Sequence, residues 1–236
     1  MAAWVQIPHP APNVEHTDHI LNFLWFLKKE GYKESTILNY SKSLRDIAKH
    51  VNLDDPEAVK DYIAKKPVSD ARKEIIVNCY DKYCKWRGIP FKKPKYRRVK
   101  RLPYVPQESD IDELISALGK RLSAFLLTIK ETGARPGELW NALWSDLDVE
   151  RKIFKINSPE KGSNPRAIPV SNRLISMLCS LPKTCKYIFR PREKSKYKTF
   201  YRHFLRQRKK VAEKLKNPRI ELINFKSLRH FKGTME

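Results

Sequence analysis

The sequence lacks any apolar segment long enough to cross a lipid bilayer. Its longest apolar run, residues 20–27, is interrupted by Asn22 and is far shorter than the roughly 20 residues that a membrane helix needs. The N-terminus also lacks the pattern of a signal peptide, because prolines at positions 8, 10 and 12 interrupt it. We therefore expect a soluble, cytoplasmic protein that has no membrane partner.

Cysteine is scarce as well. Four cysteines stand at positions 79, 84, 179 and 185, and no separation matches the two-residue spacing of zinc knuckles. No histidine stands suitably near either pair. Cys79 falls on the apolar face of a predicted helix. We expect four reduced, mostly buried thiols and no metal site.

Acidic residues are few relative to basic ones. The chain has 49 Lys and Arg against 26 Asp and Glu, a formal net charge of +23 spread along its whole length. A field of this sign attracts polyanions and speeds encounter with them. Generic solubility explains it poorly, because such an imbalance costs the compact state self-repulsion. Nucleic acid is the leading partner, and an anionic membrane surface is the alternative.

Residues 1–90 contain apolar side chains at three- and four-residue steps, which predicts four amphipathic helices with short connections. The fourth helix should begin after Ser69 and end at Gly88. Its predicted buried stripe runs from Ile75 through Cys79 and Tyr80 to Trp86. Four such helices predict a compact all-helical unit.

A basic segment, residues 91–105, follows. Its prolines and like charges disfavour a regular element, which indicates a linker. Its density of cations favours a position against DNA phosphates, with a solvated tether as the alternative. The cations in question are Lys92, Lys93, Lys95, Arg97, Arg98, Lys100 and Arg101.

Residues 106–236 predict a mainly helical unit with a small antiparallel sheet. Ser109 and Asp112 have the spacing of a capping box at the first helix. Residues 153–156 and 166–170 have the composition of strands joined by a polar turn. Later helices are expected at 171–180, at 195–215 and from about residue 225.

Two separated segments contain the residues of greatest chemical interest. Arg135 lies in a glycine-marked turn, followed by Pro136 at the first position of a helix. An arginine there directs a planar, permanently charged group at an anion. Near the other end of the chain, Lys226, Arg229 and His230 share adjacent turns of a predicted helix. Two arginines and a lysine that converge on one point would suit a phosphodiester.

These segments resemble the tyrosine recombinases of the phage-integrase family. The run Thr-Gly-Ala-Arg-Pro-Gly-Glu-Leu at 132–139 resembles the first-arginine motif of that family, and 144–148 resembles the segment that follows it. The hairpin at 158–170 resembles the one that bears the family's lysine. Lys-Ser-Leu-Arg-His at 226–230 resembles the His-x-Leu-Arg-His motif, with Lys226 replacing the first histidine. That replacement resembles integrases of archaeal viruses and plasmids.

The resemblance implies a two-domain, C-shaped DNA clamp. Residues 1–90 would form a helical core-binding domain, 91–105 the linker, and 106–236 an α+β catalytic domain. The implied activity is site-specific DNA recombination through 3′-phosphotyrosyl linkages, for integration of a mobile element. The implied partner is double-stranded DNA with inverted half-sites, bound by a dimer or tetramer of the full enzyme. No cofactor or metal is implied, because the phosphotyrosine conserves the bond.

The resemblance also implies roles for individual residues. Arg135 and Arg229 would bind the scissile phosphate, and Glu138 would orient Arg135. Lys161 would be the general acid that protonates the departing 5′-oxygen. Lys226 suits electrostatic stabilisation better than proton abstraction. His230 would contact the catalytic residues rather than the DNA itself. Further phosphate contacts are expected from Arg166, Arg202, Arg206, Arg208, Lys209 and Lys210.

One element of the family pattern is missing. The nucleophilic tyrosine should lie some tens of residues beyond the second arginine, yet no tyrosine follows Arg229 before Glu236. We interpret the chain as a truncated product that binds DNA without cutting it. The alternatives are a non-catalytic, sequence-specific DNA-binding regulator of the same fold, a relative of the type IB topoisomerases, and a basic RNA-binding protein.

Overall fold

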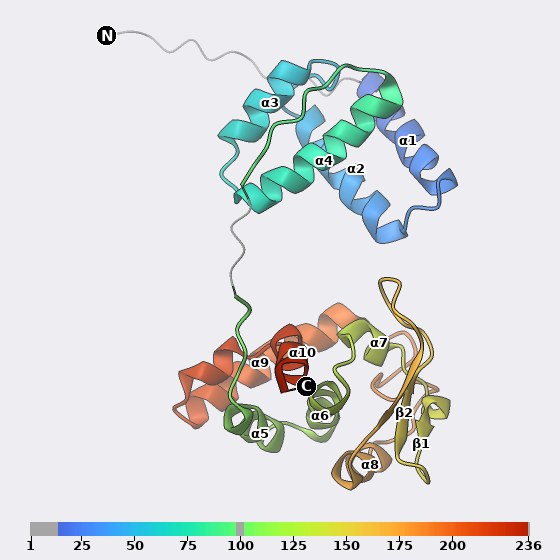
Figure 1. Cartoon of the computed structure of the whole chain (residues 1–236), viewed down its shortest axis with the longest axis vertical. Coiled ribbons are helices and arrows are strands. Elements are labelled where there is room, and N and C mark those ends of the chain that lie inside the picture. Colours follow the sequence, from blue (N-terminus) through green and yellow to red (C-terminus); the bar gives the residue numbers. More distant parts are fainter. Residues whose placement is uncertain (1–13, 98–101, 236) are drawn as a thin grey trace. The chain divides into compact units, whose positions relative to one another are not determined.

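The structure is a computed structural model that describes residues 14–97 and 102–235. The chain divides into two compact units, Met1–Arg101 and Leu102–Glu236 (Figure 1). Helices dominate both, and the second contains a small antiparallel sheet. The predicted mainly helical fold with a small antiparallel sheet is therefore confirmed. Within the described residues, no helix is long and apolar enough to span a membrane.

The first unit consists of four helices: α1 (Val14–Lys29), α2 (Glu34–Ala48), α3 (Pro56–Lys65) and α4 (Asp70–Arg87). Their short connections and their apolar faces follow the predicted periodicity. The faces meet in one core, whose largest fully buried side chains are Ile20, Phe23, Leu27, Leu44, Ile47, Leu53, Tyr80 and Tyr83.

Helix α4 begins after Ser69 and ends at Gly88, as predicted, because Gly88 adopts the left-handed conformation (φ 74°) that ends many helices. One residue of its predicted buried stripe is exposed. Ile75 is 49% exposed, whereas Ile76 is buried. The helical repeat turns the face that contains Ile76, Tyr80 and Tyr83 toward the core, and Ile75 lies outside it.

The basic segment after α4 has no regular secondary structure from Phe91 to Arg97. Its first part packs on the helical unit: the ring of Phe91 meets that of Tyr80 edge-on at 4.9 Å, and Tyr96 also contacts this core. The first part of the predicted linker is therefore held against the helical unit by Phe91 and Tyr96. Its cations in this part, Lys92, Lys93, Lys95 and Arg97, are exposed, whereas Arg98, Lys100 and Arg101 lie outside the described residues.

The second unit is built around α6 (Lys120–Thr132), whose residues 122–129 are all buried. Figure 1 shows α6 among the other helices, with the sheet at one edge of the unit. An all-round apolar helix is expected at the centre of a helical layer. The surrounding helices are α5 (Glu108–Ala117), α7 (Pro136–Trp140), α8 (Asn172–Cys179), α9 (Tyr197–Lys214) and α10 (Phe225–Met235), with the 3-10 turns η1 (Trp144–Asp146) and η2 (Pro218–Leu222).

The sheet has the order β1 (Leu147–Asp148), β2 (Ile153–Ile156), β3 (Arg166–Pro169), and both pairings are antiparallel. The hairpin of β2 and β3 matches the prediction, whereas the two-residue strand β1 was not foreseen. Ile156 pairs with Arg166, so residues 157–165 form the loop of this hairpin.

Two local predictions in the second unit were wrong. Helix α5 begins at Glu108, so Ser109 lies inside its first turn and caps nothing. Asp112 instead accepts a hydrogen bond from Lys130 Nζ at 2.7 Å, which joins α5 to α6. Of the cysteines, Cys79 and Cys84 are buried as expected, but Cys179 is exposed at the end of α8.

Candidate functional site

The turn after α6 sets the position of Arg135. Gly133 is left-handed (φ 61°) and its N–H returns to the carbonyl of Ile129 at 2.9 Å, which ends the helix. The hydroxyl of Thr132 then accepts the N–H of Ala134 at 3.2 Å. Arg135 becomes the N-cap residue of α7, because Pro136 fits the first helical position.

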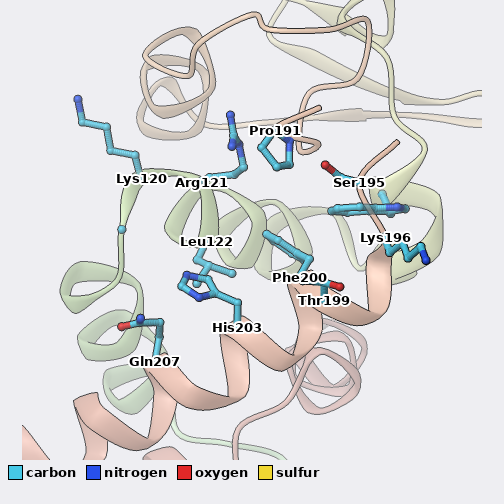
Figure 2. Close-up of a pocket in the computed structure, with 12 residues that line it drawn as sticks. Lys120, Arg121, Leu122, Pro191, Ser195, Lys196, Thr199, Phe200, His203 and Gln207 are labelled. Atoms are coloured by element: carbon cyan, nitrogen blue, oxygen red, sulfur yellow. The ribbon is translucent and has the colours of Figure 1, made fainter. Parts of the chain in front are cut away.

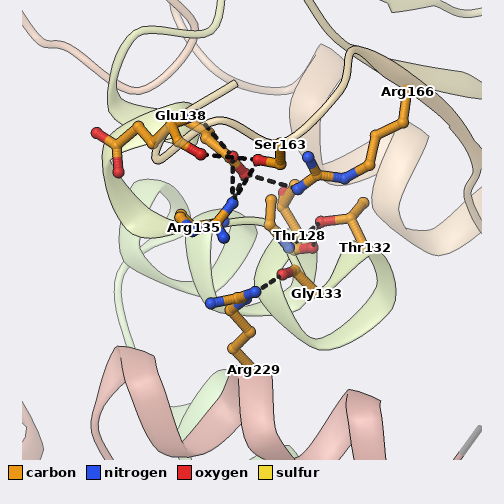
Figure 3. A network of polar contacts seen from close by, with 10 residues as sticks. Thr128, Thr132, Gly133, Arg135, Glu138, Ser163, Arg166 and Arg229 are labelled. Atoms are coloured by element: carbon orange, nitrogen blue, oxygen red, sulfur yellow. Dashed lines mark hydrogen bonds and ion pairs between the residues drawn. The ribbon is translucent and has the colours of Figure 1, made fainter. Parts of the chain in front are cut away.

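Helix α10 presents Arg229 to this turn. Asn224 caps the helix, because its Oδ1 accepts the N–H groups of residues 226 and 227, each at 3.0 Å. Phe225, Leu228 and Phe231 recur at three-residue steps and are buried in the core. Arg229 therefore lies off the buried face, and its Nε donates to the carbonyl of Gly133 at 2.9 Å (Figure 3). This bond joins residues that are 96 positions apart.

Arg135, Arg166 and Arg229 line one pocket of about 430 Å³. The predicted phosphate site requires the first and last of these residues to meet, and the structure brings them together from the start of α7 and from α10. The side chain of Arg166 reaches the same pocket from the start of β3. The other lining residues are Thr132, Gly133, Ser163, Asn164, Pro165, Lys232 and Gly233.

Glu138 is a buried carboxylate behind this pocket, with 4% of its surface exposed. Arg166 Nη2 donates to it at 2.6 Å and Arg135 Nη1 at 3.0 Å, as Figure 3 shows. It also accepts the backbone N–H groups of Arg135 and Glu160, at 2.8 and 3.1 Å. Burial alone would raise the pKa of Glu138, but these donors outweigh it and lower the pKa to about 2.

The pocket is strongly cationic. Burial lowers the pKa of Arg229, and the neighbouring Arg135 and Arg166 lower it further, against the attraction of Glu138. An arginine stays charged despite such a shift. Two guanidinium groups bond the buried carboxylate of Glu138 and that of Arg229 lies beside them, so the pocket retains a positive excess that a bound anion would offset. Arginine matches phosphate oxygens with bidentate, charge-assisted hydrogen bonds.

The loop between β2 and β3 closes one side of the pocket through Ser163. The hydroxyl of Ser163 accepts Arg135 Nη1 at 2.6 Å and donates to the carbonyl of Glu160 at 2.7 Å. The sequence analysis did not single out Ser163. Its place between Lys161 and Arg166 in a polar turn was the signal that could have identified it.

Three of the proposed catalytic residues lie outside the pocket lining. Lys161 is exposed and left-handed (φ 56°) in the β2–β3 loop, and Lys226 is exposed in the first turn of α10. His230 is half-buried, and its Nε2 is buried without a hydrogen-bond partner among the residues that the structure describes. Lys232, which the sequence analysis missed, does line the pocket. Its three-residue separation from Arg229 on one helix could have identified it.

The predicted cations of α9 divide into two kinds. Arg202, Arg206, Lys209 and Lys210 are exposed and available to a polyanion. Arg208 is not: its Nη1 donates to the carbonyl of Ile223 at 2.5 Å, and burial lowers its pKa. Arg208 therefore holds α9 against the segment before α10, which corrects the DNA contact expected of it.

A larger pocket of about 660 Å³ lies elsewhere in the second unit (Figure 2). Leu122, Trp140 and Phe200 provide its apolar surface, and Lys120, Arg121 and Lys196 add cations. It shares no lining residue with the arginine pocket. Its size alone does not identify it as the functional site, because the converging charged groups are in the smaller pocket.

Comparison with known proteins supports a specific family. Residues 105–235 match the sequence profile of the phage integrase family. No curated protein sequence matches the chain. One similar solved structure is the Tn1549 transposon integrase in complex with circular intermediate DNA, with a TM-score of 0.71 and 14% sequence identity. Another is a lambda integrase tetramer bound to a Holliday junction, with a TM-score of 0.67 and 16% sequence identity.

The alignments extend over both units of the chain. The Tn1549 integrase alignment covers 92% of this chain and 86% of that one, and the lambda integrase alignment covers 94% and 74%. At identities this low, the likeness establishes a shared fold. The match to the family profile covers the second unit, which contains the arginine pocket.

Proposed function

The chain belongs to the phage integrase family, and from this premise we propose that it acts on DNA as a site-specific recombinase. The arginine pocket is the observation that carries the proposal. Arg135, Arg166 and Arg229 lie around a space of about 430 Å³. In the proposed mechanism Arg135 and Arg229 hold the non-bridging oxygens of the scissile phosphodiester and offset the charge that grows on them in the transition state.

The residues around the pocket have supporting roles in this proposal. Glu138 orients Arg135 and Arg166, and the turn at Gly133 orients Arg229. Lys161 remains the proposed general acid, because a loop residue can approach the phosphate when DNA binds. Lys226 and His230 remain proposed contributors to the surroundings of the site.

Both units contact DNA in this proposal. The helical unit and the recombinase unit bind one half-site, and the basic segment between them follows the phosphates. In this proposal two protomers bind inverted half-sites and four assemble for strand exchange. The similar lambda integrase structure is a tetramer bound to a Holliday junction.

Binding to duplex DNA should depend steeply on salt. If about eight cations meet phosphates, the logarithm of affinity falls with the logarithm of salt concentration with a slope of about −7. Fluorescence anisotropy of a labelled duplex, titrated between about 50 and 200 mM salt, measures this slope. A slope close to zero would contradict a phosphate-binding role for the exposed cations. Structured RNA at matched salt tests the RNA-binding alternative.

A polypeptide of residues 1–236 should bind DNA without forming a covalent adduct. Among its residues no tyrosine follows Arg229, and Tyr197 and Tyr201 of α9 pack against the core of the second unit. Burial raises the pKa of Tyr197 to about 12, and its ring packs against Trp140 at 5.8 Å. Tyr201 packs against Phe225 at 5.2 Å.

Denaturing gel electrophoresis after incubation with nicked duplexes measures such adducts. A covalent band would identify a nucleophile within these residues and overturn the proposal of binding without cleavage. Each tyrosine can then be replaced by phenylalanine to locate it.

A further inference from the structure

Lys232 is the lysine that lines the arginine pocket in the described structure, although the sequence pointed to Lys161 and Lys226 instead. It lies three residues after Arg229 on α10, and residues at that separation share a helix face. The helix is fixed against the core by Phe225, Leu228 and Phe231. Its cationic face therefore has a defined orientation.

The stem of Lys232 passes close to the turn that positions Arg135. A Cβ atom at Gly133 would lie 3.3 Å from Lys232 Cγ and 3.8 Å from Lys232 Cβ. Arg229 Nε donates to the carbonyl of the same Gly133. Both α10 residues thus contact Gly133, whose missing side chain leaves room for the stem of Lys232, and both line the same pocket.

A fourth cation at the pocket would offset the negative charge that increases during the proposed reaction. A phosphodiester has one negative charge in its ground state and gains a second in the pentacoordinate transition state. Lysine is a compact charge on a flexible stem, so it can follow the phosphate oxygens more easily than a fixed guanidinium can.

We propose that Lys232 binds the scissile phosphodiester together with Arg135, Arg166 and Arg229, and supplies the ammonium group that the sequence motif had assigned to Lys226. This proposal rests on the proposed function of the arginine pocket. Lys226 is exposed in the first turn of α10 and lies outside the pocket lining, so its ammonium contacts other DNA phosphates or solvent.

The test uses dimethyl phosphate, the smallest phosphodiester, and the 236-residue protein. Backbone amide NMR signals of residues 133 and 163 report binding at the pocket. Lys232→Gln should weaken dimethyl phosphate binding about tenfold, the scale of one charge-assisted hydrogen bond. Lys214→Gln removes the same charge from an exposed position in the last turn of α9 and is the control, with affinity within about twofold of the unchanged protein.

Two further variants make the outcome decisive. Lys232→Arg keeps the charge and should recover part of the affinity, which a merely structural role would not explain. Equal affinities for the Lys232→Gln and Lys214→Gln proteins, both folded by their amide spectra, would overturn the assignment of Lys232. Unchanged binding by Arg229→Ala would instead overturn the proposed function of the whole pocket.

Discussion

Glu138→Ala should destabilise the second unit by about 3–5 kcal/mol, the usual cost of removing one partner from a buried ion pair. Glu138 is 4% exposed and accepts bonds from two guanidinium groups and two backbone N–H groups. Without it, Arg135 and Arg166 would face each other without a counter-charge. Urea denaturation, with hydrogen exchange of α6 as the local probe, measures the loss.

Glu131→Ala is the matched control for this prediction. Glu131 is also on the second unit and accepts bonds from the N–H and hydroxyl of Ser171, at 2.8 and 2.6 Å, but it holds no cation in any ion pair of the described residues. Its removal should cost only about 1 kcal/mol, as for an ordinary hydrogen bond. Equal losses for the two variants would mean that Glu138 is no more than a hydrogen-bond acceptor.

The lowered pKa of Glu138 also predicts that the stability of the second unit depends on pH. Its folded pKa of about 2 lies below the ordinary value of 4.5, so its contribution is complete above about pH 4.5 and disappears as the pH falls toward 2. The shift corresponds to about 3 kcal/mol at 1.36 kcal/mol per pH unit. Glu138→Gln should flatten this part of the stability profile. An unchanged acid profile would assign the sensitivity to other carboxylates.

Much of the fold could be predicted from local patterns. The helical stripes of the first unit and the stop at Gly88 depend on side chains a few residues apart, and the structure follows them. The start of α5 shows the limit of this reasoning. Ser109 had the spacing of a cap, but α5 begins at Glu108 and Asp112 pairs with Lys130 on α6, a contact that is not visible in a local pattern.

The site could be predicted only in part, for the same reason. Arg135 and Arg229 were singled out by motif and do line one pocket. Ser163 and Lys232 were missed, because their importance depends on how the β2–β3 loop and α10 approach the turn at Gly133. Arg208 shows the opposite error: a basic residue on a basic helix was expected outside, yet its guanidinium reaches the carbonyl of Ile223. Charge in the sequence does not reveal which way a side chain turns.

Arg229→Ala and Arg229→Lys should weaken duplex DNA binding for different reasons, and the difference separates charge from geometry. Arg229 uses Nε to bind the carbonyl of Gly133 at 2.9 Å, which leaves its two Nη groups for a phosphate. Lysine keeps the charge but cannot make this arrangement. We expect each variant to lose about 10- to 100-fold in affinity, the scale of a lost charge-assisted pair.

The salt dependence then distinguishes the two variants. Arg229→Ala should reduce the slope of log affinity against log salt by about 0.9, because one phosphate contact is lost, whereas Arg229→Lys should keep the slope. Arg202→Ala, at an exposed position of α9, is the control for an ordinary backbone contact: its slope should also change by about 0.9, with a smaller loss of affinity. If Arg229→Lys binds as tightly as the unchanged protein, the hydrogen bond to Gly133 does not orient the group for phosphate, and Arg229 acts through its charge alone.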